Sequence, residues 1–163
     1  MPNWCFNTAE VTRKNPAMLK MFSDSFDNST LFSNFFPLPE GRDDWYEWAI
    51  EEWGTKWDIE SDNVSIIDAN NIQVFFQSAW SPPIEAYSKL ETMGFKIRAM
   101  YHEPGAAFCG MYEDTNDECY DYTKMTATEI KNTIPEELDE MFNISEYIEE
   151  WEQDENNELK ETL

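Results

Sequence analysis

The chain has 163 residues, and 34 acidic against 11 basic residues give it a formal net charge of −23 at pH 7. This charge argues against direct binding of DNA, RNA or anionic membranes, because affinity for those polyanions comes largely from Lys and Arg. It favours basic surfaces, cations or proteins that themselves bind nucleic acids as partners. The alternative interpretation is a halophilic or merely soluble acidic protein.

The sequence gives no sign of export or of a membrane anchor. No stretch approaches the roughly 18 apolar residues that span a bilayer, and residues 1–4 have no signal-peptide character. The three cysteines form no CxxC pair, so we expect reduced thiols, no zinc site and a cytoplasmic protein. The oxygens of Asp114, Asn116 and Glu118 lack the Gly and the bidentate Glu of a calcium loop, so neither a metal nor a cofactor is expected.

Hydrophobic periodicity predicts an alternation of strands and helices over the first hundred residues. Asn15 is the expected N-cap of the first helix, and Ser81, ahead of Pro82, that of a later helix, which Gly94 ends. The predicted elements, in chain order, are a strand (4–11), a helix (16–26), an irregular apolar segment (27–42), a helix (44–53), two strands (57–67 and 72–79), a helix (82–93) and a strand (95–102).

This order, β-α-β-β-α-β, is the ferredoxin-like plan of the α+β class, in which helices cover one face of an antiparallel sheet. The other face is expected to be covered by a further segment or to bind a partner. Segments 106–112 and 119–123 are candidates for an added hairpin. We therefore predict a ferredoxin-like domain over residues 1–124, with an aromatic insertion at about 27–56.

The last 63 residues differ in character, because they carry 19 acidic and three basic residues. Thr126-x-x-Glu129 and Thr133-x-x-Glu136 both match the capping box that opens a helix. Apolar residues at i, i+3, i+4 and i+7 within 144–151 predict an amphipathic helix, and the pattern fades from Gln153 into a frayed tail. Residues 125–163 are therefore predicted to form an acidic helical extension.

Four ordered blocks of the first 112 residues resemble the YubB-type family of small phage and plasmid proteins. They are Met1-Pro2-Asn3-Trp4-Cys5-x-Asn7, Trp53-Gly54-Thr55-Lys56-Trp57-Asp58, Trp80-Ser81-Pro82-Pro83 and Glu103-Pro104-Gly105-x-x-Phe108-x-Gly110. The resemblance implies a ferredoxin-like domain and an origin in a mobile element, but no mechanism. The acidic C-terminal helices lie outside the matching part.

The aromatic blocks also suggest a pocket, since they are expected to converge at one end of the sheet. Lys56, Asp58, Trp80, His102 and Glu103 would line it. A His beside a carboxylate can transfer protons near neutral pH. However, no second His, nucleophile elbow or phosphate loop accompanies it, so no catalytic residue is assigned. The alternative is that tryptophans, glycines and ion pairs simply hold the loops together.

Carboxylates along the C-terminal helices offer a second kind of site. A helix rises ~1.5 Å per residue, so an acid at every second or third position approaches the charge density of duplex DNA, about one per 1.7 Å. The alternative is a solvated helix face. The candidate partner-binding residues are Asp139, Glu140, Glu146, Glu149, Glu150, Glu152, Asp154 and Glu155.

The charge and the resemblance together predict a non-enzymatic binding protein of a phage or mobile element. It would inhibit a host defence complex of the CRISPR or restriction type by mimicking nucleic acid. Its partner would be the basic surface of that complex. The first alternative is an enzyme or small-ligand protein that uses the pocket described above. The second is a structural protein that assembles through its aromatic patches, and the oligomeric state is left open.

Overall fold

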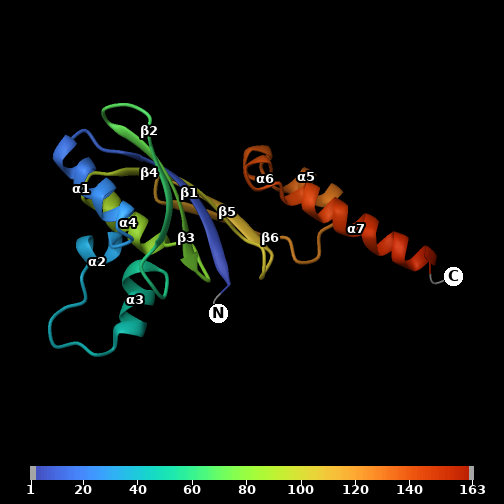
Figure 1. Cartoon of the computed structure of the whole chain (residues 1–163), viewed down its shortest axis with the longest axis horizontal. Coiled ribbons are helices and arrows are strands. Elements are labelled where there is room, and N and C mark those ends of the chain that lie inside the picture. Colours follow the sequence, from blue (N-terminus) through green and yellow to red (C-terminus); the bar gives the residue numbers. More distant parts are fainter. Residues whose placement is uncertain (1–2, 162–163) are drawn as a thin grey trace.

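A computed structural model describes residues 3–161 and shows one six-stranded antiparallel sheet with helices on both faces (Figure 1). Met1 and Pro2 of the first family-like block lie outside the described residues. The strands are β1 (Trp4–Thr12), β2 (Glu60–Ile66), β3 (Asn71–Ala79), β4 (Lys96–Glu103), β5 (Phe108–Glu113) and β6 (Asn116–Asp121). The helices are α1 (Pro16–Asp27), α2 (Leu31–Phe35), α3 (Trp45–Trp53), α4 (Ile84–Thr92), α5 (Ala127–Thr133), α6 (Glu136–Phe142) and α7 (Ile144–Glu161). None of these helices has the length and apolar composition needed to cross a membrane.

The α+β class is as predicted, but the ferredoxin-like plan is wrong. The sheet has six strands in the order β2-β3-β1-β4-β5-β6, and residues 3–161 form seven helices. The expected hairpin exists, yet it continues the main sheet, because Ala99 pairs with Tyr112 and Tyr101 with Gly110. The pattern of a single strand does not reveal such pairing, and five of the six residues of β6 are exposed.

One face of the sheet carries the larger hydrophobic core, which α1, α2 and α4 cover. Inward residues of each strand alternate with residues of the opposite face, as pleating requires. Phe26 and Phe32 are completely buried in this core. Asn15 caps α1 as predicted, because its side chain accepts hydrogen bonds from the backbone N–H groups of Ala17 (3.1 Å) and Met18 (3.2 Å).

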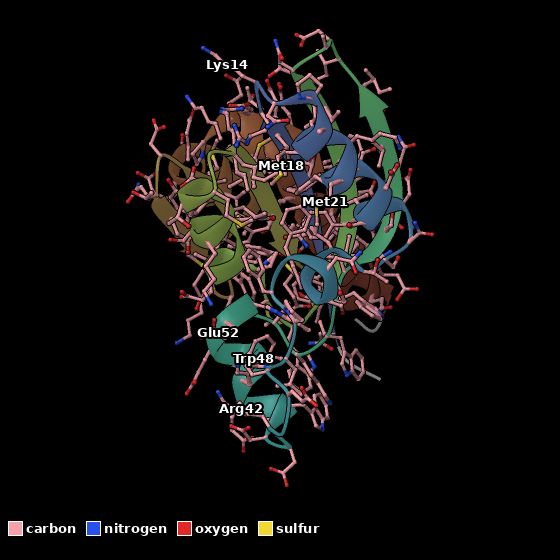
Figure 2. All side chains as sticks on the ribbon, turned by 90° about the vertical axis from the view of Figure 1, so that its left-hand side faces the viewer. Lys14, Met18, Met21, Arg42, Trp48 and Glu52 are labelled. Carbon is pink, nitrogen blue, oxygen red and sulfur yellow. The ribbon has the colours of Figure 1, made fainter. Side chains whose placement is uncertain are left out.

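The aromatic insertion packs on the body instead of forming a loose linker. The rings of Phe35 and Phe95 meet edge to face with centroids 5.9 Å apart. Glu52, on α3 (Figure 2), forms an ion pair with Lys89 of α4. Gly54 ends α3 with a left-handed φ of +79°, and a Cβ atom there would lie only 3.2 Å from the backbone nitrogens of Ile84 and Glu85 in α4. Ser81 donates a hydrogen bond to the Gly54 carbonyl (2.7 Å), so it does not cap α4, whose N-cap is Pro83.

The opposite face is partly covered by the acidic extension. A second core joins Met100 of β4 and Cys109 of β5 to Ile130, Leu138 and Ile144 of α5, α6 and α7. The extension is therefore packed on the sheet through its apolar residues. It covers the β4–β5–β6 side, while the β1 side of this face stays more open, as Figure 1 shows for the position of α5–α7.

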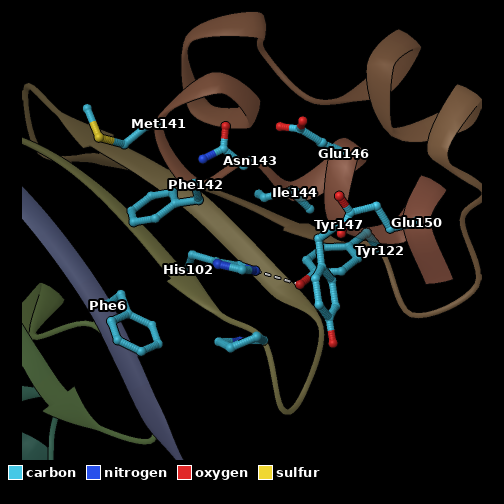
Figure 3. A pocket seen from close by; sticks show the side chains of 11 residues that line it. Phe6, His102, Tyr122, Met141, Phe142, Asn143, Ile144, Glu146, Tyr147 and Glu150 are labelled. Atoms are coloured by element: carbon cyan, nitrogen blue, oxygen red, sulfur yellow. Dashed lines mark hydrogen bonds between the residues drawn. The ribbon is translucent and has the colours of Figure 1, made fainter.

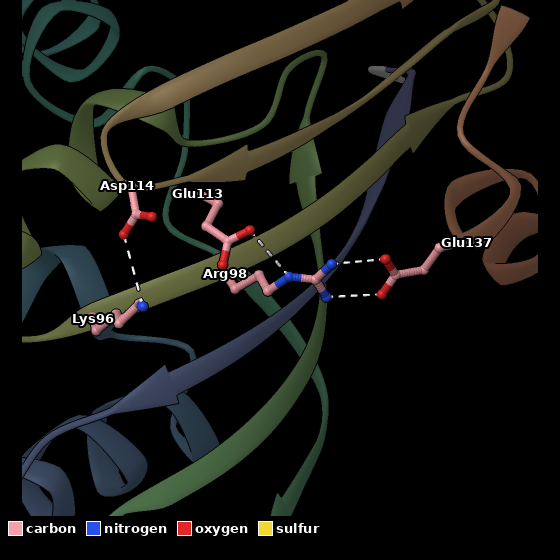
Figure 4. Close-up of polar contacts among 5 residues, drawn as sticks. All are labelled: Lys96, Arg98, Glu113, Asp114 and Glu137. Atoms are coloured by element: carbon pink, nitrogen blue, oxygen red, sulfur yellow. Dashed lines mark hydrogen bonds and ion pairs between the residues drawn. The ribbon is translucent and has the colours of Figure 1, made fainter.

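Ion pairs reinforce this docking at the surface. Arg98 of β4 makes a bidentate contact with Glu137 of α6, at 2.8 and 2.7 Å, and a third hydrogen bond of 3.3 Å with Glu113 (Figure 4). Lys96 lies 3.7 Å from Asp114 at the tip of the β5–β6 hairpin. Bidentate Arg–carboxylate geometry fixes orientation as well as distance, so Arg98 sets where α6 sits on the sheet.

The last helix is longer than predicted. The expected frayed tail from Gln153 is instead the second half of α7, which runs to Glu161. Thr162 and Leu163 lie outside the described residues. All residues from Gln153 to Lys160 are exposed, and Figure 1 shows this half of α7 running away from the sheet. It therefore offers its surface to solvent or to a partner.

Leu138→Ala should lower the free energy of unfolding by about 2–5 kcal/mol, because it leaves a cavity in the second core. Leu138 is fully buried between the sheet and α7. Urea denaturation would measure the loss, with the exposed Glu140→Ala on the same helix as control. Equal, small losses for both variants would mean that the extension is not packed on the sheet.

Candidate functional site

The main pocket lies where the open side of the second sheet face meets the acidic helices. It has a volume of about 790 Å³ and is widely open to solvent. Its lining residues are Phe6, His102, Pro104, Tyr122, Met141, Phe142, Asn143, Ile144, Glu146, Tyr147 and Glu150 (Figure 3). Strands form one wall and the α6–α7 junction forms the other, so the site exists only because the extension docks.

The α6–α7 junction gives the pocket its shape. Asn143 adopts a left-handed φ of +52°, which breaks the helix between Phe142 and Ile144. The carboxylate of Asp139 then accepts hydrogen bonds from the Ser145 backbone N–H (2.7 Å) and hydroxyl (2.6 Å). Carboxylates that accept from the first N–H groups of a helix stabilise its start. Asp139 therefore fixes the direction in which α7 leaves α6.

His102 and Tyr122 form the floor of the pocket. The Nε2 atom of His102 and the hydroxyl oxygen of Tyr122 lie 2.6 Å apart in a hydrogen bond, and the Phe142 ring centroid is 5.4 Å from the imidazole centroid. Burial lowers the pKa of His102 to about 4 and raises the pKa of Tyr122 well above its usual value. Both groups are therefore neutral at pH 7.

The rim of the pocket is acidic. Glu146 and Glu150 lie one helical turn apart on α7 and are exposed, with Tyr147 between them. Tyr147 is 66% exposed, although the sequence pattern placed it on the buried stripe with Ile144 and Ile148. The site thus combines a neutral aromatic floor with two carboxylates at its edge.

His102→Gln should change how stability depends on pH. His102 has a folded-state pKa of about 4, below its unfolded value of about 6.5, so the unfolded state binds the proton first as pH falls. Between pH 7 and pH 4.5, the free energy of unfolding should therefore fall by about 2–3 kcal/mol more in the wild type than in His102→Gln. Urea denaturation of both proteins at several pH values measures this difference. The carboxylates that face the pocket, including Glu146 and Glu150, are common to both proteins, so their titration cancels in the comparison. A stability difference that stays constant with pH would contradict the prediction.

The five predicted pocket residues do not form one site, although Lys56 and Trp80 lie together. Of the five, only His102 lines the pocket. Asp58 instead accepts hydrogen bonds from the backbone N–H groups of Phe32 (2.9 Å) and Ser33 (2.8 Å) at the start of α2. Glu103 is buried and accepts from the backbone of Gly105 (2.9 Å) and Ala106 (2.6 Å). Both carboxylates hold loops in place.

Lys56 and Trp80 form a separate aromatic cluster at one end of the sheet. The Lys56 ammonium lies 4.6 Å from the Trp57 ring centroid, 4.9 Å from that of Trp80 and 5.7 Å from that of Tyr46. These are cation–π distances. Trp80 holds a left-handed φ of +69° and its backbone N–H donates to Asn3 O at 2.9 Å. The Trp53–Asp58 and Trp80–Pro83 blocks thus converge as expected.

Strand geometry explains why His102 and Glu103 do not line the same pocket. His102 and Glu103 are successive residues of β4, so their side chains point to opposite faces of the sheet. A sequence neighbour is therefore a poor spatial neighbour within a strand. Sequence reasoning missed all the pocket residues except His102, Glu146 and Glu150, and the missed ones include the aromatic side chains of Phe6, Tyr122, Phe142 and Tyr147. Of these, Phe6 carried a usable signal, since it alternates with the inward-facing Cys5 and Asn7 of the first strand.

The eight predicted partner-binding acids fall into two groups. Asp139 caps α7, Glu149 pairs with Lys131 at 3.0 Å, and Glu152 accepts a hydrogen bond from the Ala127 backbone N–H at 3.1 Å. These three hold the extension together. The other five are exposed acids of α6 and α7: Glu140, Glu146, Glu150, Asp154 and Glu155.

The fold and the pocket define an acidic α+β protein with an open pocket where a helical extension meets its sheet. No protein-family model matches the chain, and no curated protein matches it either. A similar solved structure is the crystal structure of the protein Api92 from Yersinia pseudotuberculosis, described with the family model DUF1281. The identity is 20% and the TM-score 0.39, over 50% of this chain and 32% of that one. The chain thus spans about a third of that protein's length. The resemblance to the YubB-type family stays a prediction.

Proposed function

We propose that the protein is a non-enzymatic binding protein that occupies the basic surface of a nucleic-acid-binding partner. In the full form of the proposal, it comes from a phage or mobile element and acts in the host cytoplasm against a CRISPR or restriction complex. The observation that carries the proposal is the exposed acidic row of α7. A direct nucleic-acid ligand is disfavoured, because the net charge is −23.

The acidic row runs along one side of the helix. Glu146, Glu150 and Asp154 follow one another at intervals of four residues, which corresponds to steps of about 6 Å along the axis. All three are exposed. The second half of α7 is exposed from Gln153 to Lys160, and isolated helices of this length are marginal in water. A partner that covers this half would both neutralise and stabilise it.

Several observations weigh against the enzyme alternative. Its five residues are divided among four places in the structure, and two of them, Asp58 and Glu103, accept hydrogen bonds from backbone N–H groups. His102 is hydrogen-bonded to Tyr122, and burial lowers its pKa to about 4. A general base needs a pKa nearer the working pH. Binding without chemistry is therefore the function that we propose.

A pull-down from nuclease-treated bacterial lysate tests the proposal. The immobilised protein should capture a nucleic-acid-binding complex that leaves as salt rises, because contacts between charged surfaces are screened. Added duplex DNA or RNA should displace it by competing for the same basic surface. A captured complex that nucleic acid does not displace would contradict mimicry, as would no capture from the lysates of susceptible hosts.

A further inference from the structure

The pocket and the acidic row share two residues. Glu146 and Glu150 belong to the row and also form the rim of the pocket (Figure 3). Among the eleven lining residues, all within the described part of the chain, there is neither Lys nor Arg to neutralise them. The polar groups on the floor of the pocket, His102 and Tyr122, form a hydrogen bond with each other. The carboxylates are thus placed to receive a cation from outside.

The walls favour a particular kind of cation. Phe6 is 40% exposed and Tyr147 66% exposed, so their rings are open to contact, and Phe142 and Tyr122 complete the aromatic lining. A guanidinium group is planar, weakly hydrated, stacks on aromatic rings and binds carboxylates through two parallel hydrogen bonds. An ammonium group is a compact, strongly hydrated charge and gains less from such walls.

We propose that this pocket receives an arginine side chain of the basic partner, with its guanidinium between the aromatic walls and its N–H groups donating to Glu146 and Glu150. The proposal rests on the proposed function and deepens it. The acidic row alone would attract any basic surface, whereas a socket for one arginine fixes how α7 is placed on that surface. A volume of about 790 Å³ also accommodates residues that flank the arginine.

Neutral floor groups support this assignment. Burial holds the pKa of His102 at about 4, so the imidazole does not repel a cation at pH 7. Arg98 is the nearest basic residue of β4 on this sheet face, two positions before Met100, and it is engaged by Glu137 and Glu113. An external arginine therefore meets two carboxylates, Glu146 and Glu150, that form no ion pair with a Lys or Arg of residues 3–161.

The test uses a small probe that needs no partner. N-acetyl-arginine methylamide should bind the protein at millimolar concentration and low salt. Changes in the NMR chemical shifts of Tyr147 and His102 would measure this binding. The citrulline analogue, which has the same shape without the charge, should bind at least tenfold more weakly. The lysine analogue should also bind more weakly than arginine. Equal binding of arginine and citrulline analogues would overturn the proposal.

A pair of isosteric variants locates the site. Glu146→Gln with Glu150→Gln should weaken binding of the arginine probe at least tenfold while keeping the shape of the rim. Asp154→Asn with Glu155→Gln, further along the same helix, is the matched control and should leave probe binding nearly unchanged. Equal effects of the two pairs would mean that the probe senses net charge only, and the pocket assignment would fall.

The pull-down and the arginine-probe assay together distinguish a failure of this proposal from a failure of the proposed function. If the partner is captured and displaced by nucleic acid but the arginine probe does not bind, the arginine socket is wrong and the proposed function stands. If the probe binds the pocket but no nucleic-acid-binding partner is captured, the proposed function is wrong, and with it the claim that the arginine comes from such a partner.

Discussion

Gly110→Ala should destabilise the protein by about 3 kcal/mol or more, because the added methyl group would clash with its neighbours in the sheet. Gly110 lies directly opposite Tyr101 in the β4–β5 pair. A Cβ atom at position 110 would overlap the hydroxyl oxygen and Cζ of Tyr101 and would lie 2.5 Å from the carbonyl oxygen of Glu118. Tyr101 is 1% exposed and donates a hydrogen bond to Asp117 at 2.7 Å, so its ring cannot move aside freely.

Urea denaturation measures this effect, and two controls interpret it. Gly41→Ala has open space around the new methyl group, with strain only from its φ of +83°, and should cost about 1 kcal/mol. In a Tyr101→Leu background, Gly110→Ala should cost less than it does in wild type, because the two positions are coupled by contact. A Gly110→Ala loss no larger than that of Gly41→Ala would show that β5 does not pair with β4 in this register.

This prediction concerns the part of the fold that the sequence revealed least. Alternation was enough to find β1, β3 and β4, and the Asn15 cap was enough to place the start of α1. Gly110 carries no side chain from which a pattern can be read, and β6 is exposed along most of its length. The pairing that adds β5 and β6 to the sheet comes from contacts between strands, which one strand's periodicity does not record.

The candidate site shows the same division. The excess of acids in the C-terminal third was plain from composition, and the exposed members of α7 match that expectation. Which acids are engaged internally depends on tertiary neighbours: Glu152 reaches the start of α5, and Glu149 reaches Lys131. The pocket also required knowing that residues of α6 and α7 line the same cavity as Phe6, although they lie more than 130 positions apart in the sequence.

Reversing Glu146, Glu150 and Asp154 to Lys should reduce affinity for the basic partner at least a hundredfold, equivalent to about 2.7 kcal/mol. These positions lie along one exposed side of α7, so the change replaces attraction with repulsion where the partner is proposed to bind. The set leaves out Asp139, Glu149 and Glu152, which hold the extension together. Circular dichroism should therefore show unchanged helix content, and a salt-dependent binding assay with the captured complex gives the affinity.

The matched control reverses Asp27, Glu40 and Glu47 to Lys, three exposed acids on or near the helices of the first face. Both triple variants change the net charge by the same amount, so they separate a specific acidic row from long-range attraction by the whole protein. The control should lower the association rate slightly and leave the dissociation rate near that of wild type, because most effects of contact residues appear in dissociation. If both variants lose affinity equally, partner binding follows total charge, and α7 does not act as a mimic of nucleic acid.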